Sequence, residues 1–220
     1  MMVKIRYFKV RFSCEFSTLI KSFQKSIKFD SSIALVDIND SQIVFNFSNV
    51  RSINIRKFID GEEFIDSVLT VDTYLFRFFQ TKNSCFLSVI DPPRGVGIIT
   101  KLMDQVLGAG QFFIEALEIT PELVSRHVKQ FESAVLVSAK IRDFEVYPGA
   151  IGRLEITSKD GLKSNIAPFL ENKFHRIDSV TYELTRNFTQ GLVYYYRNGM
   201  VRVSSPLVAA AFPAFEACLD

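Results

Sequence analysis

Side chains that could carry out acid–base or nucleophilic chemistry are few in this chain and widely spaced. His127 and His175 are the only two histidines among 220 residues, and histidine is the side chain whose ordinary pKa suits proton transfer near neutral pH. Neither lies beside a serine or cysteine in a pattern typical of a nucleophile. We therefore predict that both histidines are structural, and the sequence indicates no catalytic residue.

Three carboxylates form a pattern that faintly resembles a metal site. Asp143 and Glu145 are two positions apart on a predicted strand, so their side chains share a face, and Glu155 lies across the next hairpin with Lys159. Carboxylates that hold Mg²⁺ beside a lysine that orients water are typical of metal-dependent nucleases. The spacing departs from that arrangement, because Lys159 follows Glu155 by four positions instead of two. Solvated carboxylates are the alternative interpretation.

A second candidate site would bind an anion. Asp91 can cap a helix and Pro92 fits its first position, which predicts a helix that runs to about Leu107 and ends at glycines. The free N–H groups at a helix N-terminus attract anions, and the residues placed there are Arg94, Gly95 and Gly97. The spacing matches no nucleotide-binding motif and Asp91 would repel a phosphate, so an ordinary capped helix is the alternative.

Positive charge is concentrated in the first part of the chain. Residues 1–60 hold ten lysines and arginines against five acidic residues, although the whole chain carries a net charge of only +2. A predicted amphipathic helix over 16–27 carries lysines at near-helical spacing on its polar side. With two residues of the preceding strand they could neutralise nucleic-acid phosphates, and the candidate set is Lys4, Arg6, Lys21, Lys25 and Lys28. A solvated helix face is the alternative, since no nucleic-acid recognition motif accompanies these residues.

The three cysteines indicate the compartment. Cys14, Cys85 and Cys218 are widely spaced and lie in apolar surroundings, which is typical of reduced thiols rather than of a disulfide framework or a zinc site. The first residues lack the apolar core of a signal peptide, and no apolar run approaches the ~20 residues that cross a bilayer. We therefore expect a cytoplasmic protein with no cofactor and no membrane association.

The segment from Glu62 to Thr120 contains the clearest structural signals. Its aromatic and β-branched residues predict strands over 64–79 and 86–90, and the second is apolar on both faces, as in the interior of a sheet. Before this segment, the sequence predicts strands over 3–12, 33–38, 42–47 and 50–58, besides the helix over 16–27. The first strand changes its apolar face at Tyr7 and Phe8, where we expect a bulge or a sharp twist.

The remainder of the chain continues this pattern. Strands are predicted over 112–119, 134–146, 151–157, 162–166, 180–186, 192–197 and 200–204, with helices over 121–131 and 207–219. Thr120 and Pro121 mark the start of the first of these helices, and Asn198-Gly199 is the strongest hairpin signal. Residues 167–174 fit either a short helix or a loop. We treat 1–220 as a single unit, with 148–150 as the best place for a lobe boundary.

These signals together predict a fold class and a kind of function. Hairpins predominate over β-α-β alternation, so we predict an α+β fold, mainly antiparallel sheet with three to four covering helices. An apolar fraction of 48% predicts exposed apolar surface, and hence a protein partner or a homo-oligomer. We interpret the chain as a non-catalytic cytoplasmic binding or assembly component that acts through protein–protein contacts. The alternative is a nucleic-acid-binding or metal-dependent nucleic-acid-cleaving protein with a basic N-terminal surface.

Overall fold

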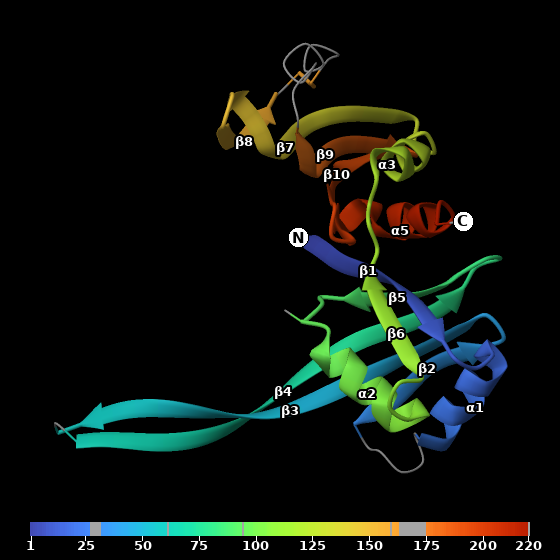
Figure 1. The fold of residues 1–220 in the computed structure, drawn as a ribbon, viewed down its shortest axis with the longest axis vertical. Helices are drawn as coiled ribbons and strands as arrows, with labels where there is room; N and C mark the ends of the chain where they lie inside the picture. The colour runs from blue at the N-terminus through green and yellow to red at the C-terminus, as the bar shows by residue number, and fades with distance from the viewer. Residues whose placement is uncertain (27–31, 61, 94, 159, 163–174, 220) are drawn as a thin grey trace.

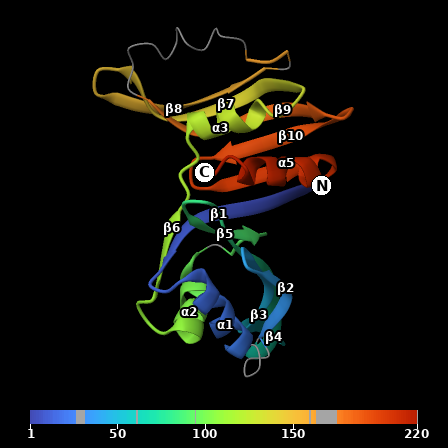
Figure 2. The same cartoon turned by 90° about the vertical axis from the view of Figure 1, so that its right-hand side faces the viewer.

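The fold is that of a large antiparallel sheet with helices packed against it (Figures 1 and 2). The computed structural model describes all residues except 27–31, 61, 94, 159, 163–174 and 220. The sheet has eleven strands and is accompanied by four α-helices in the described ranges, with 57% of residues in strands and 21% in helices. The prediction of a mainly antiparallel α+β fold is confirmed, and the balance lies further toward strand than three to four covering helices would imply.

Hydrogen-bonded neighbours follow the order β2-β3-β4-β5-β1-β11-β10-β9-β7-β8, and β6 pairs with the end of β1. The strands are β1 (Met2–Phe12), β2 (Ile33–Asn39), β3 (Gln42–Ile59), β4 (Glu62–Gln80), β5 (Cys85–Ile90), β6 (Phe112–Ala116), β7 (Ser133–Tyr147), β8 (Ala150–Thr157), β9 (Arg176–Arg186), β10 (Thr189–Tyr196) and β11 (Met200–Ser204). The helices are α1 (Phe16–Ser26), α2 (Gly97–Leu107), α3 (Pro121–Val128) and α5 (Val208–Glu216), and a 3₁₀ turn, η2 (Ser205–Leu207), precedes α5.

Strand β1 joins two hydrophobic clusters that lie on opposite faces of the sheet. Ile5 and Tyr7 belong to a cluster with α3, α5 and the strands β9 to β11, here called the α5 cluster. Phe8 and Val10 belong to a cluster with α1, α2 and the strands β2 to β5, here called the α1–α2 cluster. The register of β1 against β5 is unbroken from Ile5 to Val10, so no bulge interrupts the strand there. The apolar face changes because side chains alternate and each half of β1 is covered from a different side.

Helix α2 begins later than predicted. It starts at Gly97, after Val96, whose side chain makes no cap hydrogen bond, and not at Pro92. Asp91 has a φ of 45°, outside the geometry of an N-cap, and Pro93 disfavours helical backbone at Pro92. The predicted start of α3 is confirmed, because its N-cap Thr120 accepts a hydrogen bond from the N–H of Leu123 at 3.3 Å, whereas the helix ends at Val128 and not at about Phe131.

The main departure from the predicted strands concerns β3 and β4. The segments 42–47 and 50–58 form one continuous strand, and it pairs along its whole length with β4. Neighbouring strands accompany this hairpin only at its base, where β2 pairs with residues 42–47 of β3 and β5 pairs with residues 75–80 of β4. Residues 49–60 and 62–73, here called the arm, therefore extend away from the rest of the molecule as a two-stranded ribbon (Figure 1).

The C-terminal half adds the second part of the sheet. Pro148 and Gly149 form the hairpin turn between the paired strands β7 and β8, and Gly199 takes a φ of 85° in the predicted turn between β10 and β11. Pro213 lies inside α5. The predicted strand over 162–166, except Leu162, and the undecided segment 167–174 lie outside the described residues. No helix in the described ranges has the length and apolar composition needed to span a bilayer.

Candidate functional site

The arm exposes an unusual amount of apolar surface. Nine of its large apolar side chains are exposed, with exposed fractions from 41% to 73%: Val50, Ile53, Ile55, Phe58, Phe64, Ile65, Val68, Leu69 and Val71. Summed over both faces of the arm, leaving about half of nine such side chains in water amounts to on the order of 700 Å², so each face is comparable to the largest patch on a typical monomer, roughly 300–600 Å². Apolar patches of this size on a monomer are often functional.

These side chains occupy both faces of the arm. Residues directly opposite in the register share a face, so Ile53 and Val68 lie on one side and Val50 and Val71 on the other. Neither face of the arm is covered in the described structure, since every one of these side chains is classed as exposed. A two-stranded ribbon is at best marginally stable in water on its own, so the arm is held in the described structure mainly by its own strand pairing and by its base.

The two outer edges of the arm are also open. Among the described residues, β3 has no strand partner on its outer edge beyond Phe47, and β4 has none before Leu75. Open edges present unpaired N–H and C=O groups that can pair with another chain. The arm therefore combines exposed apolar side chains with free backbone hydrogen-bonding groups.

Charge is divided between the two strands of the arm. The β3 strand contributes only basic charged residues, Arg51, Arg56 and Lys57, and the β4 strand contributes only acidic ones, Glu62, Glu63, Asp66 and Asp72. Within the arm, Arg51 pairs with Asp72, Lys57 pairs with Asp66, and Arg56 pairs with Glu63 at 3.3 Å. These side chains are largely exposed, so each pair contributes little to stability. The arm therefore has one basic strand and one acidic strand.

The base of the arm is held firmly by aromatic packing. Phe45 on β3 and Phe76 and Phe78 on β4 are at most 1% exposed, and they pack with Phe23 of α1 in the α1–α2 cluster. The ring centroids of Phe23 and Phe45 are 4.9 Å apart. The apolar stripe that begins in this core continues along the same strand face to Ile53 and Val68, where nothing covers it.

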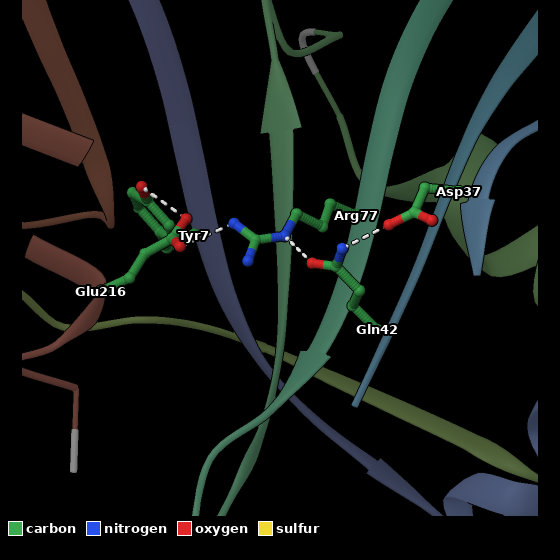
Figure 3. Close-up of polar contacts among 5 residues, drawn as sticks. All are labelled: Tyr7, Asp37, Gln42, Arg77 and Glu216. Atoms are coloured by element: carbon green, nitrogen blue, oxygen red, sulfur yellow. Dashed lines mark hydrogen bonds and ion pairs between the residues drawn. The ribbon is translucent and has the colours of Figure 1, made fainter. Parts of the chain in front are cut away.

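A polar network fixes the other face of the base to α5 (Figure 3). Arg77 on β4 donates to Glu216 of α5 at 2.6 Å and to the side-chain oxygen of Gln42 at 2.9 Å. Gln42 in turn donates to Asp37 of β2, and the hydroxyl of Tyr7 donates to Glu216 at 3.3 Å. Burial, together with the nearby charge of Glu216, raises the pKa of Tyr7 well above its ordinary value. The network ties β1, β2, β3, β4 and α5 together where the arm begins.

A separate pocket lies beside α3. It has a volume of about 620 Å³, within the range of small-molecule sites, and its apolar lining includes Ile119, Val124, Leu136, Val180 and Tyr182. Both carboxylates of the described lining are paired with arginines: Arg197 donates to Glu118 at 2.7 Å, and Arg142 lies 3.0 Å from Asp178. The described lining also includes His175, and it contains no cysteine.

The structure places the predicted basic residues on different elements. Lys4 and Arg6 lie on the half of β1 that pairs with β11, and Arg6 donates to the carbonyl of Asn198 at 3.3 Å. Lys21 and Lys25 are exposed on α1, which packs against the other half of β1 in the α1–α2 cluster. Lys28 lies outside the described residues. In the antiparallel register, Lys4 on β1 lies opposite Arg202 on β11, and the guanidinium of Arg202 lies 5.5 Å from the ring centre of Tyr194.

The residues of the predicted anion and metal sites lie around the start of α2 and on the β7–β8 hairpin. Gly95 precedes α2 and Gly97 is its first residue, and Arg94 lies outside the described residues. Asp143 sits in an irregularity of the β7–β8 pairing with a φ of 53°, which breaks the strand alternation that would align it with Glu145. Glu155 lies further along β8 and pairs with Lys140 at 2.9 Å. Among the described residues, no group of three or more potential ligands could hold a metal ion.

His127, Cys85 and Cys218 are in environments that suppress reactivity. His127 is fully buried, and its Nε2–H donates to the carbonyl of Ala211 at 3.0 Å while Nδ1 accepts from the hydroxyl of Tyr195 at 2.6 Å. Burial lowers the pKa of His127 to about 4. Burial also raises the pKa of Cys85 to about 12 and raises that of Cys218, so neither thiol is a nucleophile at neutral pH.

The arm was not predicted from the sequence. The sequence predicts strands on either side of Asp60, but it does not show that both pair continuously beyond their neighbours, as β3 and β4 do in the structure. Comparison of the chain with protein-family models finds no match, and comparison with curated proteins finds no similar sequence. The arrangement of the residues themselves is therefore the basis for a functional proposal.

Proposed function

We propose that this chain is a non-catalytic assembly component and that the arm is its protein-docking element. The observation that carries the proposal is the set of nine exposed apolar side chains on a two-stranded ribbon with open edges. Surface of this kind costs stability in water and becomes favourable when a partner covers it. The cysteines Cys14, Cys85 and Cys218 are free, which is typical of a reducing compartment, and we place this assembly in the cytoplasm.

The energetics of the arm are consistent with docking. At about 25 cal/mol per Å², burying on the order of 700 Å² gives roughly 15 kcal/mol before the costs of association. Those costs amount to about 4–15 kcal/mol, so a partner that covers most of the arm can be held stably. The aromatic packing and the Arg77–Glu216 pair hold the base of the arm in place, which reduces the ordering cost on binding.

The proposal is tested by replacing apolar residues of one arm face with threonine, which keeps strand propensity. The arm variant carries Phe58→Thr, Ile65→Thr and Leu69→Thr, which are 73%, 62% and 71% exposed. The control variant carries Phe113→Thr, Val146→Thr and Ile151→Thr, which are 62%, 54% and 70% exposed and lie on strands outside the arm. Sedimentation velocity and affinity capture with the full chain measure self-association and bound protein.

The expected outcome is that the wild type and the control variant form complexes and that the arm variant does not. Circular dichroism checks that all three chains keep their sheet content. Complexes of unchanged size and amount with the arm variant would refute docking through the arm. A wild-type chain that stays monomeric at high concentration and captures no protein would refute the assembly role itself.

A further inference from the structure

We propose that the partner of the arm is a second copy of this chain, joined through unlike edges: the β3 edge of one arm pairs with the β4 edge of the next. This inference rests on the proposed docking function of the arm and names its partner. It follows from the charge pattern of the two strands and from their open edges.

The two edges of the arm carry opposite charge. Residues 49–59 of β3 contain three basic residues and no acidic one, while residues 62–73 of β4 contain four acidic residues and no basic one. Side chains on the face of a strand reach laterally to the strand on either side, so the outer edge of each strand presents the same sign of charge as the strand itself. The arm therefore has one basic edge and one acidic edge.

This pattern selects between the ways in which two arms could pair. A two-fold dimer through the edges must pair β3 with β3 or β4 with β4, because such an interface uses the same surface on both copies. Either choice puts like charges across the new ladder, which is destabilising. Pairing β3 of one copy with β4 of another puts Arg51, Arg56 and Lys57 beside an acidic strand, which is the favourable combination.

The hairpin itself shows that these two strands are compatible neighbours. Its own β3 and β4 pair without a break from Gln42 to Ile59, and three ion pairs form across that ladder, including Arg56 with Glu63. A second copy offers the same β4 sequence to the other edge of β3. Such pairing satisfies the open N–H and C=O groups and brings the exposed apolar side chains of two arms alongside one another.

Pairing two copies in this way leaves one free arm edge at each end of the pair. After two copies join, one still has a free β3 edge and the other a free β4 edge, so the contact is heterologous and growth continues until the assembly closes on itself or extends as a filament. We therefore expect assemblies larger than a dimer whose size increases with concentration.

Charge-reversed arms test this pairing in trans. The acidic-arm variant carries Arg51→Glu, Arg56→Glu and Lys57→Glu, and the basic-arm variant carries Glu63→Lys, Asp66→Lys and Asp72→Lys. Each alone has like charges on both edges and is expected to associate at least ~10-fold more weakly than the wild type. An equimolar mixture of the two restores opposite charges only between chains, and sedimentation velocity is expected to show assemblies that contain both variants.

A chain carrying all six reversals is the control for folding. It keeps complementary charges both within the arm and between arms, so it should assemble like the wild type, and circular dichroism should show the same sheet content for all variants. Assembly of either single-sign variant at wild-type strength, or failure of the mixture to assemble while the six-fold variant does so, would overturn the pairing through unlike edges. A monomeric wild type whose captured protein is lost with the threonine arm variant would overturn the second copy as partner and leave the docking function standing.

Discussion

Replacing Gly199 with alanine tests how the two halves of the sheet are joined. Gly199 lies in the turn between β10 and β11 with a φ of 85°, and its carbonyl accepts a 2.8 Å hydrogen bond from the N–H of Tyr7. A Cβ at this position would lie 2.5 Å from the carbonyl oxygen of Tyr7 and 2.8 Å from that of Leu117. Both neighbours are backbone atoms, which cannot turn away as the end of a flexible side chain can. The turn would have to move out of the junction between β1 and the segment after β6.

The expected cost follows from two contributions. Left-handed backbone costs a residue with a Cβ about 1–2 kcal/mol relative to glycine, and forcing an extra methyl group into a packed site costs roughly 1–3 kcal/mol. Gly199→Ala is therefore expected to destabilise the protein by about 2–5 kcal/mol. Gly149 is the matched control, because its φ of 83° is nearly the same and a Cβ there would meet nothing within 4 Å. Gly149→Ala should cost only the backbone contribution, about 1–2 kcal/mol.

The measurement is urea unfolding of the wild type and both variants, followed by circular dichroism and by tyrosine fluorescence. Coincident transitions with the two probes would justify a two-state treatment. We expect a clearly lower midpoint urea concentration for Gly199→Ala than for Gly149→Ala, at similar slopes of the unfolding free energy against urea. Equal destabilisation of the two variants, within about 0.5 kcal/mol, would show that the close approach at the junction is not a real constraint.

The other predictions concern the buried histidine, the polar network at the base of the arm and the basic residues. Burial lowers the pKa of His127 to about 4, below the ordinary value of about 6.5. As the pH falls, the unfolded chain therefore takes up a proton at this histidine before the folded chain does, and the free energy of unfolding decreases between about pH 6.5 and pH 4 by at most roughly 3 kcal/mol. Urea titrations should show this loss in the wild type but not in His127→Phe. Replacing Arg77 with methionine leaves the largely buried Glu216 without its ion-pair partner and should lower the free energy of unfolding by about 1–3 kcal/mol. Glu216→Gln in the same chain should restore part of that loss, whereas additive effects of the two substitutions in a double-mutant cycle would contradict the coupling. If the N-terminal surface binds nucleic acid, electrophoretic shifts with DNA and RNA should weaken at least ~100-fold between about 50 and 200 mM salt and disappear on reversing the charges of Lys4, Arg6, Lys21 and Lys25, whereas no binding at low salt would leave these residues as solvated side chains.

Several elements could be predicted from the sequence because local interactions decide them. The turn at Asn198-Gly199 follows from the backbone freedom of glycine, and the start of α3 follows from the Thr120 cap and the fixed φ of Pro121. Residues 86–90 are apolar on both faces, and they form β5 between β4 and β1, in the interior of the sheet. The antiparallel character of the sheet follows from the short polar turns between successive strands.

The exposure of the arm could not be predicted in the same way, because it depends on whether other strands and helices pack against the arm. The alternation of Ile53 and Ile55 with polar residues on β3 resembles that of Ile43 and Phe45 on the same strand, yet the latter pair is buried and the former is exposed. A pattern of alternating residues specifies a strand with an apolar face and does not specify whether another layer covers that face. Whether the face is covered depends on how far β2, β5, α1 and α2 extend alongside β3 and β4. Contacts between residues distant in the chain determine that extent.

The same distinction applies to the residues with chemical potential. The sequence alone determined that the chain is rich in antiparallel strands and poor in reactive groups, since composition and local backbone preferences are properties of short segments. Only the tertiary structure decided that Tyr7 and Phe8 face different cores and that Asp143 lies in an irregularity of the β7–β8 pairing. It alone also decided that the hairpin of β3 and β4 extends beyond its neighbours to form an uncovered arm. The physical reason is that burial, register and the length over which strands pair are set by long-range packing, which a single segment does not encode.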